Sequence, residues 1–157
     1  MRIVYISSSI IPSRFANSIN VMKMCQAMAK IGHEVILIAP DIIDKYENNV
    51  SDIFAFYGVD RCFNMIKLPW LKIKGQTCLY GLNAALKAKS LKPDLVYSRS
   101  LIDCFFTAFL GLQLLFESHL PVEKKSNLQR WMFLNVLKSR SFRKLVVITL
   151  PQSITMK

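Results

Sequence analysis

The chain has 157 residues, of which 52% are hydrophobic and 20% charged, and its formal net charge is +11. This length and composition fit one domain with a substantial core and exclude a disordered chain. The positive charge favours anionic partners, whether nucleic acid, acidic lipid or phosphorylated small molecules, without choosing among them. The surplus lies at the C-terminal end, because eight lysines and arginines and no acidic residue follow Glu123.

The first forty residues predict a strand, a long loop, a helix and a second strand. Residues 2–7 and 34–39 are short apolar runs, and residues 18–31 have helical spacing. Asn17 or Ser18 is expected to cap this helix. Two strands joined by one helix normally lie parallel, with a right-handed crossover.

The rest of the chain predicts further alternation of strands and helices. Predicted strands occupy residues 63–68, 94–97, 114–116 and 145–148, and predicted helices occupy residues 50–57, 76–91, 101–112 and 126–139. The strands are continuous apolar runs, which is typical of a parallel sheet covered on both faces. The sequence therefore predicts an α/β fold with a doubly wound, Rossmann-like parallel sheet, as one domain over residues 1–157.

The four cysteines show no spacing typical of metal ligands, and they are Cys25, Cys62, Cys78 and Cys104. We interpret them as free, mostly buried thiols in a cytoplasmic protein, and we expect neither a metal nor a cofactor. The N-terminal apolar run is short and predicts no signal peptide. The longest apolar run, residues 104–112, is too short to span a bilayer.

Ligands of doubly wound sheets bind beyond the carboxyl ends of the strands, where the strand order reverses. This rule selects the loop over residues 7–18 and the turns at 98–100 and 117–119. The loop has no glycine, so neither glycine-rich phosphate-binding motif is present. Its polar groups, including Ser9, Arg14 and Asn17, suit sugar hydroxyls or a phosphate. The alternative is a solvated loop whose polar residues cap the helix.

Three side chains in the later turns are further candidates. Arg99 follows a predicted buried strand and is either an anion clamp at the crevice or part of a salt bridge with Asp94 or Asp103. Glu117 and His119 alternate at the end of the next strand, so both can point to the same side. They can act as an acid–base pair or bond sugar hydroxyls, whereas the alternative for His119 is a histidine satisfied by the backbone.

Residues 126–139 predict a basic amphipathic helix. Its apolar residues include Leu128 and Trp131, and they alternate with Arg130 and Lys138. This helix could lie on an anionic membrane surface, or it could cover the sheet with a solvated face that happens to be basic. No nucleic-acid-binding motif is present, and we expect no nucleic-acid partner.

Six stretches, taken in chain order, resemble family 4 glycosyltransferases. They are RIVYIS at 2–7, NSINVMKMC at 17–25, GHEV at 32–35, PDLVYSR at 93–99, FESHLP at 116–121 and KLVVIT at 144–149. The resemblance implies a GT-B-type fold of two facing Rossmann-like domains. This chain would be the N-terminal, acceptor-binding domain, and the donor domain would be absent from it.

The resemblance also implies an activity, namely the transfer of a sugar from a nucleotide-sugar to a glycan or lipid-linked acceptor with retention of configuration. In the family, a pair of glutamates separated by seven residues contacts the nucleotide-sugar. No two glutamates in this sequence have that spacing. We therefore expect a truncated chain that is inactive alone and meets a nucleotide-sugar only with a second domain.

In that setting Glu117 and His119 are the expected catalytic residues. The expected substrate-binding residues are Ser9, Arg14, Asn17 and Arg99. Because many family members dock their N-terminal half on membranes, a peripheral position on the inner face of the membrane, through residues 124–144, is also expected. The alternative function is a non-catalytic Rossmann-like module that binds a membrane or a partner chain.

Overall fold

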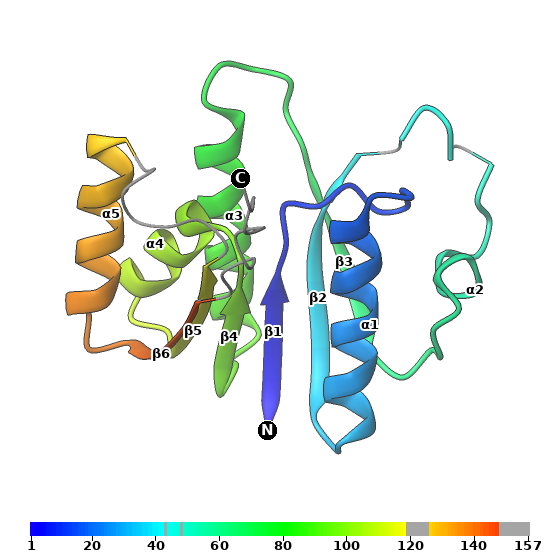
Figure 1. Ribbon diagram of the computed structural model, residues 1–157, viewed down its shortest axis with the longest axis horizontal. Coiled ribbons are helices and arrows are strands. Elements are labelled where there is room, and N and C mark those ends of the chain that lie inside the picture. Colours follow the sequence, from blue (N-terminus) through cyan, green and yellow to red (C-terminus); the bar gives the residue numbers. More distant parts are fainter. Residues whose placement is uncertain (43, 48, 119–125, 148–157) are drawn as a thin grey trace, which may run out of the picture.

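The computed structural model describes residues 1–42, 44–47, 49–118 and 126–147 (Figure 1). The strands are β1 (Arg2–Ile6), β2 (Glu34–Asp41), β3 (Asn64–Pro69), β4 (Leu95–Ser98), β5 (Leu114–Ser118) and β6 (Phe142–Val147). The helices are α1 (Ala16–Lys30), α2 (Ile53–Tyr57), α3 (Gln76–Ser90), α4 (Leu101–Phe109) and α5 (Asn127–Lys138). None of these helices is long and apolar enough to cross a membrane.

All six strands of the described sheet are parallel, in the order β3-β2-β1-β4-β5-β6. The order reverses between β1 and β4, whose residues pair from Ile3 with Leu95 to Ile6 with Ser98. The predicted α/β fold with a doubly wound, Rossmann-like parallel sheet is therefore confirmed. In Figure 1 the carboxyl ends of the strands lie toward the top, so the loops that follow β1 and β4 meet at one edge of the sheet.

Strand β1 shows why its apolar residues form a continuous run. Ile3 and Tyr5 pack in the core layer beneath α1, whereas Val4 and Ile6 pack in the layer beneath α3, α4 and α5. Both faces of the strand are therefore covered, as expected for a parallel sheet. Each fully buried aliphatic side chain of this kind contributes about 1.5–3 kcal/mol to stability.

Helices α3 and α4 pack closely at Gly81. A Cβ atom at this position would lie 2.9 Å from the Cγ2 atom of Ile102 and 3.0 Å from the Oδ1 atom of Asp103. The glycine therefore lets the backbone of α3 approach the first turn of α4, and it leaves the carboxyl of Asp103 enclosed.

Two local expectations were wrong. Helix α1 begins at Ala16 with Phe15 as its N-cap and no side-chain cap, because Asn17 and Ser18 lie inside the first turn and bond to the preceding loop. The cysteines are divided evenly, since two of them are buried and two exposed. Cys25 and Cys104 are buried, whereas Cys62 and Cys78 are exposed.

Candidate functional site

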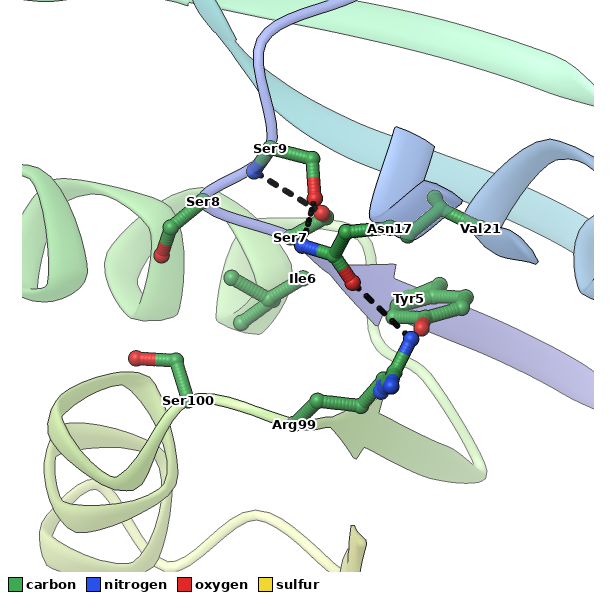
Figure 2. Close-up of a pocket in the computed structure, with 9 residues that line it drawn as sticks. All are labelled: Tyr5, Ile6, Ser7, Ser8, Ser9, Asn17, Val21, Arg99 and Ser100. Atoms are coloured by element: carbon green, nitrogen blue, oxygen red, sulfur yellow. Dashed lines mark hydrogen bonds between the residues drawn. The ribbon is translucent and has the colours of Figure 1, made fainter. Parts of the chain in front are cut away.

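A pocket of about 270 Å³ lies at the carboxyl ends of β1 and β4, where the strand order reverses (Figure 2). This is the position that the doubly wound fold favours for ligands. The loop after β1, the first turns of α1 and the turn after β4 supply its walls. The lining residues are Tyr5, Ile6, Ser7, Ser8, Ser9, Asn17, Val21, Arg99 and Ser100.

A hydrogen-bonded network joins three of these residues across the pocket (Figure 2). The Nδ2 atom of Asn17 donates to the Oγ atom of Ser9 at 2.6 Å. The Nη1 atom of Arg99 donates to the Oδ1 atom of Asn17 at 2.9 Å and to that of Asn20 at 3.1 Å. The side chain of Arg99 is therefore held between α1 and β4 in one orientation.

Glu117, at the end of β5, extends the network from the opposite side. Its Oε1 atom lies 3.2 Å from the Nε atom of Arg99, and the two side chains are only 6% and 20% exposed. The pair holds both side chains in place. Removing one partner would leave the other as an uncompensated buried charge, which is destabilising. Of the two interpretations of Arg99, a salt bridge is present, but its partner is Glu117 and not Asp94 or Asp103 as suggested.

Arg99 lines the pocket, whereas Glu117 is buried and does not, so the wall offers the guanidinium of Arg99 beside the hydroxyl of Ser9 and the amide of Asn17. Such a combination suits hydroxyl groups, which both donate and accept. Glu117 also offsets much of the positive charge of Arg99 at short range. A hydroxylated ligand therefore fits this wall better than an isolated phosphate would.

Tyr5 adds a hydroxyl to the pocket wall that the sequence did not reveal. Its oxygen is buried and lies close to the guanidinium of Arg99, but no hydrogen bond of good geometry joins it to a described residue. Burial raises the pKa of Tyr5 far above its usual range, although the Arg99 cation opposes the rise. The group therefore stays a neutral donor. In the sequence Tyr5 belongs to an apolar strand, and nothing distinguishes it from a core residue.

Asp103, in the first turn of α4, lies behind the pocket wall. The Oγ atom of Ser8 donates to its Oδ2 atom at 3.1 Å, and its own backbone N–H donates to the Oγ atom of Ser100 at 3.4 Å. The Oδ1 atom has no partner among the described residues. Burial raises the pKa of this carboxyl to about 6, against the lowering effect of the neighbouring serines. The pocket residue Ser8 thus donates to a carboxyl whose pKa is raised toward neutrality.

The loop between β1 and α1 is held in place by side chains from other elements. The hydroxyl of Tyr57 accepts from the backbone N–H of Ser13 at 2.7 Å and donates to its carbonyl at 2.8 Å. The hydroxyl of Tyr80 donates to the carbonyl of Ser7 at 2.6 Å. Lys67 donates to the Ile11 carbonyl, and burial lowers the pKa of its ammonium group. The pocket is therefore preformed without the glycines of a phosphate-binding loop.

The serines of this loop divide by function. The Oγ atoms of Ser13 and Ser18 lie 2.7 Å apart and each lies 2.8 Å from the carbonyl oxygen of Ile10, so the two hydroxyls share two hydrogen bonds among these three oxygens. They therefore stabilise the loop and do not cap the helix. Ser9, in contrast, lines the pocket.

Two predicted site residues do not join the network. Arg14 is 80% exposed and pairs with Glu47 at 2.5 Å on the other side of α1. His119 lies outside the described residues, so its pairing with Glu117 stays a prediction. In the part of the chain that the structure describes, no group of three or more His, Cys, Asp or Glu residues could hold a metal ion.

The comparisons with known proteins find a distant likeness to solved structures. No family model matches the chain, and no curated protein matches its sequence. The chain is similar to the 2.2 Å crystal structure of a putative UDP-N-acetylglucosamine 2-epimerase from Listeria monocytogenes, with 10% identity and a TM-score of 0.47. The likeness covers 83% of this chain and 36% of that one, so this chain spans about a third of its length. At this level the likeness assigns neither a family nor a function.

Proposed function

We propose that this chain is the acceptor-binding domain of a retaining, nucleotide-sugar-dependent glycosyltransferase, whose acceptor is a glycan or a lipid-linked sugar. The network of Ser9, Asn17, Arg99 and Glu117 at the reversal point of the sheet carries the proposal. The ordered resemblance to family 4 glycosyltransferases supports it and supplies the reaction.

In this proposal the acceptor lies in the pocket with its hydroxyls on Arg99, and the buried carboxylate of Glu117 positions that guanidinium. Asn17, itself bonded to Ser9, positions the guanidinium of Arg99 in the pocket wall. Tyr5 supplies a neutral hydroxyl donor. His119 completes the acceptor side with Glu117. A second domain brings the nucleotide-sugar, because the glutamate pair that contacts the donor in the family does not occur in this sequence. In this proposal the described residues supply the acceptor site of the enzyme.

Calorimetric titration of the full chain tests this proposal. The probes are methyl glycosides of glucose, galactose, mannose and N-acetylglucosamine, together with the 1-phosphates of the same sugars. We expect at least one methyl glycoside to bind, and Arg99→Gln to weaken it about tenfold, since a hydrogen bond to a charged group contributes about 1.5 kcal/mol or more.

Arg61→Gln is the matched control, because Arg61 also pairs with a carboxylate, Asp52 at 3.0 Å, but away from the pocket. Equal weakening by both variants, or no binding by any sugar in the panel, would contradict the proposal.

A second candidate function, docking on an anionic membrane, is favoured by α5. Its buried face covers the sheet, which agrees with the interpretation of residues 126–139 as a sheet-covering helix. This face consists of Met132, Phe133 and Val136. Its other face leaves Trp131 55% exposed and Leu128 65% exposed. Exposed basic residues flank them, and an aromatic among cations is typical of an interfacial helix.

Co-sedimentation with vesicles tests this second function. Phosphatidylglycerol vesicles should bind the chain more strongly than phosphatidylcholine vesicles, and Trp131→Ala should reduce the binding severalfold. Leu86→Ala, which removes a half-exposed apolar side chain from α3, is the control. Binding that does not depend on anionic lipid would exclude this function.

A further inference from the structure

The loop before α1 forms a second hollow on the side of α1 away from the pocket. This hollow has a volume of about 440 Å³, and we call it the Arg14 groove. The loop and the segment after β2 both lie at the carboxyl end of the sheet (Figure 1). The groove is lined by Arg14, Phe15, Asp44, Tyr46 and Glu47.

Two aromatic side chains of the groove are open to solvent. Phe15 is 62% exposed and Tyr46 is 78% exposed. Aromatic rings present flat apolar faces at little cost in side-chain entropy, which makes them suitable contact surfaces for a ligand. The C–H faces of pyranose rings stack on such surfaces.

The lining of the groove carries charges of both signs. Arg14 pairs with Glu47 at 2.5 Å, and the carboxylate of Glu47 is only 11% exposed. Arg14 also lies over the ring of Phe56, at 5.6 Å from its centroid. The Nζ atom of Lys45 lies 4.7 Å from the centroid of Tyr46. The lining residues therefore carry one cation, Arg14, and two carboxylates, Asp44 and Glu47, so the groove is not positively charged although the chain has a net charge of +11.

This combination of charges and aromatic rings restricts the kind of ligand that can bind in the groove. A wholly apolar partner would bury the charges of Arg14, Asp44 and Glu47 without hydrogen bonds, which is unfavourable. An anionic ligand would meet two carboxylates. A neutral ring with hydroxyls on its rim and C–H groups on its face satisfies both the charges and the aromatic surfaces.

We infer that the Arg14 groove is a second sugar subsite, which holds an uncharged pyranose unit of the same acceptor that enters the pocket. The inference rests on the proposed function, because it assigns the groove to the next unit of that glycan. Residues 9–17 connect the two sites, with Ser9 and Asn17 at the pocket and Arg14 and Phe15 at the groove. The acceptor is therefore at least a disaccharide, and the role of Arg14 is to bind the unit that does not react.

Amide-resolved NMR titration of the full chain tests this inference. The probes are methyl glucoside, methyl galactoside, methyl maltoside, methyl cellobioside and methyl lactoside. A disaccharide is expected to perturb the signals of Arg14, Phe15 and residues 44–47 as well as those of the pocket. A monosaccharide should perturb the pocket signals alone. Tyr46→Ala should weaken the disaccharide about tenfold, which corresponds to about 1.4 kcal/mol, and leave the monosaccharide unchanged.

Phe109→Ala is the matched control, because Phe109 on α4 is also 78% exposed and lies outside both sites. If Tyr46→Ala does not weaken a disaccharide that binds the pocket, the subsite is wrong and the proposed function stands. If groove signals move without any pocket signal, the groove binds sugar on its own, and both the proposed function and the assignment of the groove to the same acceptor are wrong. If no sugar moves either set, both are wrong.

Discussion

Replacing Asp103 by asparagine should stabilise the protein at neutral pH. The carboxyl lies enclosed between α3 and α4, with Ser8 as a hydrogen-bond donor and Oδ1 without a partner among the described residues. Its pKa rises from 3.8 to about 6 on folding. The folded state therefore binds the proton more tightly than the unfolded state, so the free energy of unfolding falls as the pH rises from about 4 to about 6.

The size of this effect follows from the two pKa values. The difference between 3.8 and about 6 corresponds to about 3 kcal/mol, at about 1.36 kcal/mol per pKa unit. Asparagine removes that penalty but weakens the bond from Ser8, which is worth about 1 kcal/mol. The variant should therefore be about 2 kcal/mol more stable than the original chain at pH 7.5, with no gain at pH 4.

Urea unfolding followed by circular dichroism, at pH values from 4 to 8, measures this difference. Asp60→Asn is the control, because Asp60 is exposed, pairs with Lys30, and has a pKa lowered below this pH range. The reasoning is refuted if Asp103→Asn is less stable than the original chain at pH 7.5, or if both show the same dependence on pH between 4 and 6.

Three further changes test the packing around the pocket. Tyr80→Phe removes the bond to the Ser7 carbonyl at 2.6 Å and should lower the free energy of unfolding by about 1–2 kcal/mol in urea titrations. Tyr5→Phe removes a buried hydroxyl that makes no hydrogen bond of good geometry with a described residue, so it should leave stability unchanged or raise it, while weakening sugar binding in calorimetry. A loss as large as that of Tyr80→Phe would contradict this difference. Gly81→Ala should lower the melting temperature in scanning fluorimetry, because its Cβ would lie 2.9 Å from the Cγ2 atom of Ile102. An unchanged melting temperature would contradict this and show that α4 can shift without loss of stability.

The sheet could be predicted from the sequence because its strands are covered on both faces. Residues such as Val4 and Tyr5 point to opposite layers, yet both are buried, so each strand appears as an unbroken apolar run. The grouping of Ser9, Asn17, Arg99 and Glu117 could be predicted for a similar reason. Each follows a parallel strand or begins the next helix, and the carboxyl ends of such strands meet at one edge.

The rest depends on contacts between distant segments, which periodicity does not encode. Arg14 lies only three residues before Asn17, yet the two side chains belong to different sites. Asn17 bonds to Ser9 at the pocket, whereas Arg14 pairs with Glu47. Asp103 resembles an ordinary helix residue in the sequence. It is enclosed only because Gly81, on a different helix, lets α3 approach.

The position of a bound sugar tests the central claim most directly. In an amide-resolved NMR titration of the full chain with the panel of methyl glycosides, the account predicts saturable shifts at Ser9, Asn17, Arg99 and Ser100. Arg99→Gln should weaken the binding that these shifts report about tenfold, and Arg61→Gln should leave it unchanged. Signals at these four residues that stay unmoved by every sugar up to about 10 mM, a concentration above the dissociation constants expected of weak sites, would contradict it.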